Sequence, residues 1–297
     1  MRKGTPHGVV LALVLAAGCA SGGGKDAGRT KAPQPSLTPP PADSATVLLW
    51  HLDESTGYGL VDSGPRGIDG VAGLDTRIDL GHLHGARTFS RTVDSFLYAE
   101  FRPALETPRA MTVEAWVRID AIGQYEDTPI ALRWNTRAAA QSWVFSVGGQ
   151  NVLPPITTLP SPGDHANLLL AGFQNRATDK LLFSFMPKEA GEPRTVVSNQ
   201  NLDLHRWIHV AATYDGKVVC LYINGRLDAQ VAAAGEIRAS DAPLVCGNSF
   251  DTRQLTTISG SLQLGQQYDH NPYYAFQGTI DELRISNVAR TSFPYVR

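Results

Sequence analysis

The stretch from Trp207 to Gly225 constrains the fold of this chain more than any other part of the sequence. Its letters are WIHVAATYDGKVVCLYING, so the dipeptides Asp-Gly and Asn-Gly each lie between apolar runs. Such dipeptides are typical of tight hairpin turns, because both central residues of a type I′ turn need positive φ. The stretch therefore predicts three consecutive antiparallel strands and an all-β fold.

The two turns also predict how the strands pair. If each turn has two central residues, Tyr214 faces Lys217 and Ile223 faces Arg226. This register lines up three small residues across the strands, namely Ala211, Cys220 and Ala229. A ladder of small side chains suits a tightly packed face of a sheet.

Residues 111–119 alternate between apolar and other side chains without interruption. Residues 181–185 repeat this pattern, and residues 281–285 do so with Asp281 on the same predicted face as Leu283 and Ile285. A period of two is typical of a strand with one face in a core. No segment after the N-terminal apolar run has a sustained helical period, so we expect two antiparallel sheets packed face to face, a β-sandwich.

The hairpin region resembles the laminin G-like branch of the concanavalin A-like lectin superfamily, in its pattern Trp-x-His-Val-Ala-x-Thr-Tyr-Asp-Gly followed by Leu-Tyr-Ile-Asn-Gly. Further matching pieces occur in the order in which the family has them: residues 50–54, 62–64, 111–117 and 278–285. The resemblance implies a concanavalin A-like jelly roll over residues 46–297. It also implies that the domain binds carbohydrate or protein, since laminin G-like domains do both.

The N-terminus has the features of a bacterial lipoprotein signal. A basic start precedes an apolar run over residues 9–17, which is too short to span a bilayer and ends at Gly18-Cys19-Ala20. We expect residues 1–19 to be a signal peptide with a lipobox-like end and Cys19 to carry the lipid; the alternative is ordinary secretion with Cys19 discarded. Residues 20–45 are rich in Gly and Pro, which predicts a disordered tether.

These features predict a location in the cell envelope, at the outer membrane if the source has two membranes, with the lipid as the only membrane contact. The charge balance excludes one class of partner. The chain has 26 basic and 28 acidic residues, a net charge of -2, and no basic block. It therefore lacks the positively charged patch that nucleic-acid binding needs.

Two cysteines remain after Cys19, and they are Cys220 and Cys246. In an oxidising compartment an even pair favours a disulfide. Two buried free thiols are the alternative, and the sequence does not decide between them.

The sequence offers little for catalysis. A glycosidase of this superfamily would need two carboxylates on one sheet face, in a run such as Glu-x-Asp-x-Glu, and no such run occurs. Glu114 is isolated, and the Gly-x-Ser-x-Gly pattern of a serine hydrolase is absent. We therefore expect that the chain is not an enzyme, and a glycoside hydrolase or lyase ranks third behind a carbohydrate-binding and a protein-binding module.

The resemblance implies a structural Ca²⁺, because related domains hold this ion with carboxylates and loop carbonyls. Asp53 and Asp281 match the acidic positions of the family and are the candidate ligands. The competing interpretation is that Asp281 accepts hydrogen bonds from backbone N–H groups of a neighbouring turn.

Several residues are candidates for binding a glycan or a protein of the envelope. The polar segment before residue 275 holds amides and aromatic rings typical of a sugar-binding rim, and its candidates are Tyr268, His270, Tyr273 and Tyr274. These side chains could equally cover the edge of the core. Trp116 would be a sugar platform if exposed, but we favour a covered, packed Trp116. His209, within a predicted strand, is expected to be a packed histidine.

Overall fold

The computed structural model describes residues 39, 42–123, 127–135, 140–149, 179–189, 193–249, 255–258, 261–264 and 275–294. The chain divides into two units, Met1–Pro35 and Ser36–Arg297, and every described residue belongs to the second. Cys19 and the four predicted rim residues of the 268–274 segment lie outside the described residues. In the described part of the chain, no helix is long and apolar enough to cross a bilayer.

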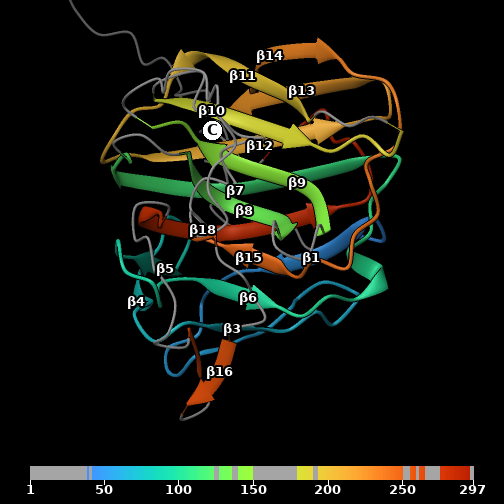
Figure 1. Cartoon of the computed structure of the whole chain (residues 1–297). Coiled ribbons are helices and arrows are strands. Elements are labelled where there is room, and N and C mark those ends of the chain that lie inside the picture. The colour runs from blue at the N-terminus through green and yellow to red at the C-terminus, as the bar shows by residue number, and fades with distance from the viewer. Residues whose placement is uncertain are drawn as a thin grey trace, which may run out of the picture. The chain divides into compact units, whose positions relative to one another are not determined.

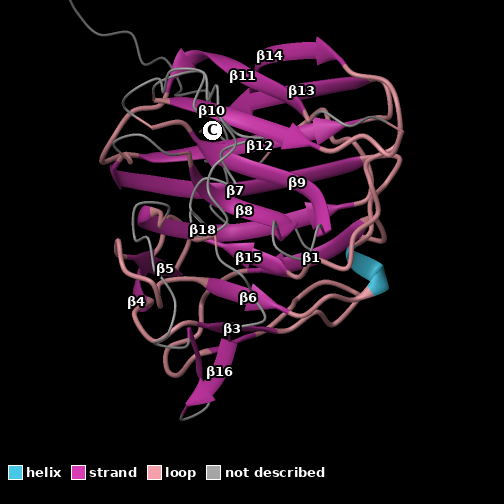
Figure 2. Ribbon diagram, viewed as in Figure 1, coloured by secondary structure: helices cyan, strands magenta, loops and turns pink. Residues whose placement is uncertain are grey.

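Two large antiparallel sheets, here called sheet A and sheet B, form the framework of the described part of this unit (Figures 1 and 2). Sheet A has the order β14 (Arg226–Ala232), β13 (Val218–Ile223), β12 (Trp207–Tyr214), β7 (Met111–Ala121), β18 (Gln277–Ser286), β5 (Gly85–Phe89) and β4 (Arg77–Leu80), with β1 (Thr46–Trp50) also paired to β18. Sheet B has the order β11 (Arg194–Asn201), β10 (Lys180–Phe185), β9 (Ala140–Val147), β8 (Thr128–Asn135), β15 (Leu244–Cys246), β6 (Leu97–Ala99), β3 (Gly70–Ala72) and β2 (Gly59–Leu60).

Two smaller elements complete the described part: a hairpin of β16 (Leu255–Ile258) and β17 (Ser261–Leu264), and a single 3₁₀ turn, η1 (Pro103–Leu105). The predicted all-β class and the antiparallel two-sheet sandwich are confirmed.

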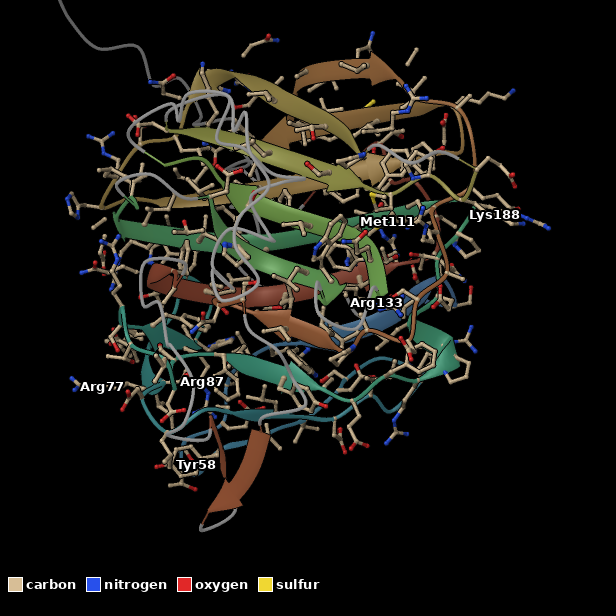
Figure 3. The ribbon with its side chains drawn as sticks, in the orientation of Figure 1. Tyr58, Arg77, Arg87, Met111, Arg133 and Lys188 are labelled. Carbon is tan, nitrogen blue, oxygen red and sulfur yellow. The ribbon has the colours of Figure 1, made fainter. Side chains whose placement is uncertain are left out.

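The hydrophobic core lies between the two sheets. The predicted apolar stripe of β7 is buried in it, as are Leu181, Phe183 and Phe185 of β10. Figure 3 shows Met111, the first residue of the stripe, among the strands, whereas Arg77 and Lys188 point away from the body of the domain. The alternation of β7 and β10 thus predicted correctly which side chains face the opposite sheet.

The buried guanidinium of Arg133 holds connecting segments against sheet B. It donates hydrogen bonds to the carbonyls of Leu105, Ser240 and Ala242 and forms an ion pair with Glu106 at 3.1 Å. Burial lowers the pKa of Arg133, but the Glu106 carboxylate opposes this effect. A buried charge needs such a full set of partners to be tolerated.

One of the two predicted turns is confirmed and the other is shifted by one residue. Asn224 and Gly225 have φ of 49° and 71°, and Ile223 pairs with Arg226 as predicted. The first turn instead has Gly216 and Lys217 at its centre, so that Tyr214 pairs with Val219. The carboxylate of Asp215 causes this shift, since its Oδ1 accepts the N–H groups of Lys217 and Val218 at 2.8 and 2.7 Å.

The shift in the first turn and a bulge in the pairing of β13 with β14 overturn the predicted ladder. The predicted disulfide is excluded by the face on which Cys220 lies, which the shift does not change. Cys220 pairs with Thr213 and Gln230 instead of Ala211 and Ala229, and it packs with Tyr222 on the face of sheet A that points away from the core. Cys246 lies in sheet B within the core, where burial raises the pKa of its thiol. Both cysteines are free thiols, because a whole sheet layer separates their side chains.

Two glycines allow a test of how tightly this core is packed. Gly247 and Gly57 have nearly the same φ, 74° and 75°, but a Cβ on Gly247 would lie 2.3 Å from the Phe89 ring, whereas a Cβ on Gly57 meets nothing within 4 Å. We expect Gly57→Ala to lower the free energy of unfolding by about 1–2 kcal/mol through backbone strain alone. Gly247→Ala should cost about 2–4 kcal/mol, because overpacking is added to the same strain.

Chemical denaturation of both variants measures these losses. Equal losses would show that Phe89 moves aside without cost.

Candidate functional site on the outer face of sheet A

The face of sheet A that points away from sheet B, here called the outer face, carries most of the polar side chains of interest. Cross-strand pairing places them in rows over β12, β7 and β18. The rows are Trp207–Arg118–Thr279, His209–Trp116–Asp281 and Ala211–Glu114–Arg284. Directly paired residues share a face, and the β7 members of these rows alternate with the core stripe.

Asp281 lies on this outer face, and the prediction that it shares a face with Leu283 and Ile285 is wrong. A bulge between Asp281 and Arg284 adds a residue to β18, and Glu282 takes a φ of 53° there. The extra residue reverses the side-chain direction along the strand, so Leu283 enters the core while Asp281 faces outward.

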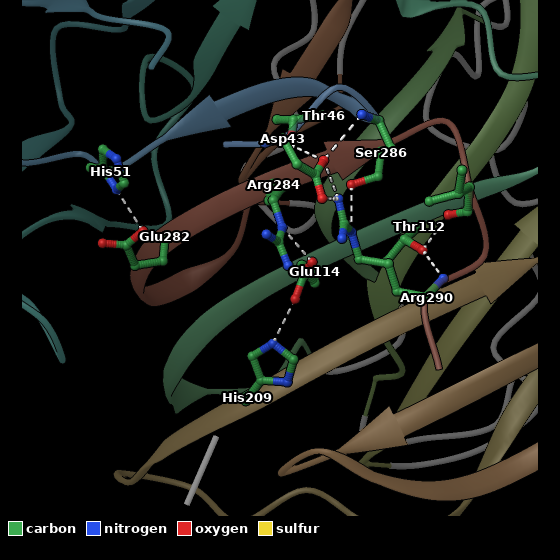
Figure 4. A network of polar contacts seen from close by, with 12 residues as sticks. Asp43, Thr46, His51, Thr112, Glu114, His209, Glu282, Arg284, Ser286 and Arg290 are labelled. Carbon is green, nitrogen blue, oxygen red and sulfur yellow. Dashed lines mark hydrogen bonds and ion pairs between the residues drawn. The ribbon is translucent and has the colours of Figure 1, made fainter. Parts of the chain in front are cut away.

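A buried ionic cluster crosses the centre of the outer face. Glu114 on β7 accepts a hydrogen bond from Arg284 Nε on β18 at 2.7 Å, and its other oxygen lies 3.1 Å from His209 Nε2 on β12 (Figure 4). The side chains of Glu114 and His209 are only 2% and 1% exposed. Burial tends to raise the pKa of Glu114, but His209 and Arg284 outweigh it and hold this pKa below its usual value.

Aromatic side chains cover this cluster. The His82 ring stacks on Trp116 with 3.7 Å between ring centroids and an angle of 25° between planes. At the other end Phe293 packs against the rings of His209 and Tyr222, at 5.1 and 5.0 Å. Trp116 is therefore 6% exposed, and His209 is 1% exposed. The structure thus shows a covered Trp116, not a sugar platform, and a packed His209.

The loop that carries His82 is held by two carboxylates. Asp281 Oδ2 accepts the N–H of Leu83 at 2.9 Å, and Asp53 Oδ1 accepts the N–H of Gly85 at 2.7 Å. Gly81 is needed for this close approach, because a Cβ there would lie 2.6 Å from Asp281 Oδ2. Both candidate calcium ligands thus bind backbone N–H groups of residues 81–85.

One oxygen of this carboxylate pair remains available to bind an ion. Asp281 Oδ1 is buried without a hydrogen-bond partner. Burial raises the pKa of Asp281 to about 7. In the part of the chain that the structure describes, no group of three Asp, Glu, His or Cys side chains is arranged to hold a metal. Asp53 and Asp281 fit a Ca²⁺ only if backbone carbonyls or water supply the other ligands.

An ion pair beside this carboxylate pair joins β1 to the bulge of β18. His51 Nδ1 lies 2.7 Å from Glu282 Oε2 (Figure 4), and this hydrogen bond raises the pKa of His51. Burial raises the pKa of Glu282, and the other Glu282 oxygen is buried without a hydrogen-bond partner. Acidic groups thus outnumber basic groups around Asp281.

The outer face is open to solvent over β14, where Leu227 and Gln230 are exposed, and at the Trp207 end. There Arg118 lies 5.6 Å from the centre of the Trp207 ring and forms an ion pair with Asp120 at 3.3 Å. Asp79 from β4 lies 3.7 Å from the same guanidinium, and His205 lies 3.9 Å from Asp120. We call these residues the Trp207 patch: Trp207, Arg118, Asp120, Asp79 and His205.

The covered centre of the outer face has no room for a ligand. A hollow beside Glu114, Trp116 and His209 has a volume of about 10 Å³, roughly that of one water molecule. In the Trp207 patch, by contrast, the side chains of Arg118, Asp120 and His205 are between 30% and 70% exposed. The Trp207 patch, unlike the covered centre, is therefore accessible to a ligand.

The Trp207 patch was not predicted from the sequence. Its single accessible signal was the alternation in the hairpin strand, which places Trp207 on the same face as His209 and opposite Arg118. The contribution of Asp79 comes from β4, which is separated from β7 in sheet A by β5 and β18, and no local pattern predicts that contact. Among the predicted glycan-binding residues, the structure describes Trp116, which lies under His82.

Known proteins are similar to this chain in sequence and in fold. A laminin G family model, described as the concanavalin A-like lectin/glucanases superfamily, matches residues 94–260. Pappalysin-1 of Mus musculus is 29% identical over 160 residues, and the human protein is 28% identical. The match covers 51% of this chain but 9% of pappalysin-1, so the chain corresponds to a small part of that protein.

Two solved structures show the same fold at low identity. The binding domain of Paraclostridial Mosquitocidal Protein 1 superposes with a TM-score of 0.55 at 12% identity, over 83% of this chain and 49% of that one. Domain 4 of AbnA, a GH43 extracellular arabinanase from Geobacillus stearothermophilus solved in complex with arabinotriose, gives 0.53 at 15% identity. That match covers 85% of this chain and 98% of that one.

Replacing Glu114 tests the ionic cluster. Glu114→Gln leaves the buried Arg284 charge without its carboxylate, so we expect the free energy of unfolding to fall by about 3 kcal/mol. Combining it with Arg284→Met should cost less than the sum of the two single changes, because both remove the same ion pair. Additive losses in urea denaturation would show that the two residues act independently.

The same variant has a signature in pH. Because the folded-state pKa of Glu114 lies below its usual 4.5, its ionised form stabilises the fold above about pH 4.5, and this contribution is lost as the pH falls below that value. The stability of Glu114→Gln should therefore decline less on acidification than that of the wild type. Parallel declines of both proteins would contradict this.

The calcium expectation is testable by melting. If Ca²⁺ binds at Asp53 and Asp281, the Tm of the protein stripped with chelator should rise with added Ca²⁺, since binding to the native state raises stability. Asp53→Asn should abolish the rise, whereas Asp120→Asn should not. A Tm independent of Ca²⁺ removes the ion, and Asp281 then acts only through the Leu83 N–H.

Proposed function

Because the chain belongs to the concanavalin A-like lectin/glucanases superfamily, we propose that it is a non-catalytic module that binds carbohydrate at the Trp207 patch. One observation carries this proposal: the outer face of sheet A is sealed over Trp116 but presents a partly exposed tryptophan amid charged hydrogen-bonding groups at one end. This combination is the one that sugar recognition requires, since a ring stacks on the apolar face of a sugar and polar groups fix its hydroxyls.

The charges of the patch favour an uncharged sugar. Arg118 is paired with Asp120 and lies near Asp79, so the single guanidinium is already neutralised. An acidic sugar at this guanidinium would meet two carboxylates. The carboxylate oxygens accept hydrogen bonds from hydroxyl groups, and exposed His205 and Arg118 supply donors to neighbouring hydroxyls.

The state of Glu114 supports a role without bond cleavage. Glycoside hydrolysis needs one carboxyl group that gives up a proton and a second that attacks or activates water. Both oxygens of Glu114 are held by His209 and Arg284, and the side chain is 2% exposed. A carboxylate buried in this way cannot reach a glycosidic oxygen.

The comparisons supply further support at the level of fold. Domain 4 of AbnA has this fold and was solved with arabinotriose bound, which shows that the scaffold can present a site for an oligosaccharide. At 15% identity the likeness does not carry a ligand over to this chain. The sugar is therefore proposed as a class, a neutral oligosaccharide, and not as arabinan.

A protein of the envelope is the second candidate ligand. The binding domain of Paraclostridial Mosquitocidal Protein 1 and the receptor binding domain of botulinum neurotoxin D, with TM-scores of 0.55 and 0.52, share the fold. If the ligand is a protein, crosslinking and pull-down from envelope fractions should yield a stoichiometric partner that the Trp207→Ala variant does not bind. Glycan arrays should then show no binding.

We place the module at the cell envelope, held by a lipid on Cys19 with residues 20–45 as the tether. The apolar run of residues 9–17 and the Gly-Cys-Ala end support this placement. The mass of the mature N-terminus tests it: a diacylated or triacylated Cys19 is expected, and an unmodified N-terminus beyond residue 19 would refute the anchor.

Glycan binding is tested with a matched pair of aromatic variants. Screening the full chain on a glycan array should give saturable binding to neutral oligosaccharides. Trp207→Ala should weaken it on the order of tenfold or more, because the stacking surface is lost. Phe101→Ala is the control, since Phe101 is also partly exposed, at 37%, and stacks on Arg133 instead of Arg118.

Circular dichroism confirms that both variants fold. Equal binding by wild type and Trp207→Ala would place the sugar elsewhere.

A further inference from the structure

The strand β4 forms an open edge of sheet A, and its four residues Arg77, Ile78, Asp79 and Leu80 are all exposed. Two of them are large and apolar, with Ile78 39% and Leu80 80% exposed. The pairing of β4 with β5 is regular, without a bulge. An exposed, regular edge with apolar side chains is a template for pairing with another strand.

The backbone of β4 presents hydrogen-bonding groups to this open edge. The Gly81 N–H donates to the His84 carbonyl at 2.8 Å, which makes Gly81 and His84 a hydrogen-bonded pair. In an antiparallel ladder such pairs alternate, so Asp79 and Arg77 bond toward β5, whereas Ile78 and Leu80 direct their N–H and C=O groups outward. The Leu80 N–H is capped by Asp79 Oδ1 at 2.8 Å, which agrees with this alternation.

The strands at other edges of the two sheets differ from β4. β14, at the far end of sheet A, has a bulge in its pairing with β13 and is tied to β11 of sheet B, because Asp228 accepts the N–H of Asn199 at 2.5 Å. β2, at the end of sheet B, has only two residues. Bulges and bonds to the opposite sheet are usual protections of an edge, and the structure shows neither for β4. Its protection consists of its length of four residues, its two charged side chains and the Leu80 N–H bound by Asp79.

The charge sequence of β4 selects its partner. If two copies of β4 pair antiparallel about a two-fold axis at Ile78, Ile78 lies opposite its own copy. Arg77 of each chain then faces Asp79 of the other. Figure 3 shows Arg77 directed outward from the domain. We propose that β4 pairs with β4 of a second copy of this chain, joining the two A sheets into one continuous sheet.

Such a dimer would bring two ligand sites together, a consequence that rests on the proposed function. The two-fold axis of an antiparallel pair is perpendicular to the sheet, so both outer faces point in the same direction. Two Trp207 patches would then face one surface, and a clustered glycan could engage both. The contact of four residues per chain is small, so the dimer should be weak.

Sedimentation velocity on the full chain, from about 1 μM to about 300 μM, tests the proposal over the range in which weak dimers form. We expect a concentration-dependent monomer–dimer equilibrium. Ile78→Lys should abolish it. Leu227→Lys is the control, since Leu227 is 52% exposed on the opposite edge strand β14, and it should leave the equilibrium unchanged.

Charge reversal tests the register. Arg77→Asp and Asp79→Arg each place like charges opposite one another twice, so each should weaken dimerisation on the order of tenfold. The double variant R77D/D79R restores opposite charges and should restore the dimer. Ile78→Cys should form an intermolecular disulfide under oxidising conditions, because directly opposed residues lie within the reach of a disulfide.

Three results would overturn the proposal: a monomer at every concentration, a dimer lost in Leu227→Lys but kept in Ile78→Lys, or a double variant as weak as its parents. None of them contradicts the proposed function, because the Ile78→Lys variant keeps all five residues of the Trp207 patch and can be screened on the glycan array by itself.

Discussion

Sheet A is buried on both of its faces over its central strands, and this double burial decides what its polar residues can do. One face meets sheet B in the apolar core, while the other lies under His82 and Phe293. A carboxylate in such a place must be paired, which is why Glu114 lies between Arg284 and His209. The same cover that stabilises Glu114 removes Trp116 and Glu114 from contact with any ligand.

Much of the fold was predictable, because it follows from short-range patterns. The alternation in β7 and β10 identified which side chains face the core, and Asn224-Gly225 fixed one turn with its register. The errors arose where a single residue changes the position of a turn or the alternation of side chains along a strand. Asp215 moved the first turn by one position through its side-chain hydrogen bonds, and the bulge at Glu282 turned Asp281 to the outer face. Neither event alters composition or hydrophobicity, so period-two reasoning does not detect it.

The site was less predictable than the fold because it depends on which segments cover a sheet face. Trp116 and Trp207 lie in strands of similar composition, yet His82 of the loop of residues 81–85 stacks on Trp116 at 3.7 Å between ring centroids. The same ring lies 6.0 Å from that of Trp207, which stays partly exposed. That loop is fixed by Asp53 and Asp281, which come from opposite ends of the domain's sequence. A pattern within one strand carries no information on such a long-range contact. The four residues predicted at the 268–274 rim lie outside the described residues, so they stay a prediction.

The first and last strands of the domain lie side by side. β1 pairs with β18, and beyond them Arg290 binds both carboxylate oxygens of Asp43 at 2.7 and 2.9 Å (Figure 4). A domain whose entry and exit points coincide in this way can be spliced into a loop of a larger host protein without stretching either one. Mechanical load applied at either end passes first through the Asp43–Arg290 ion pair and the β1–β18 ladder. These contacts would therefore break before the rest of the sandwich unfolds.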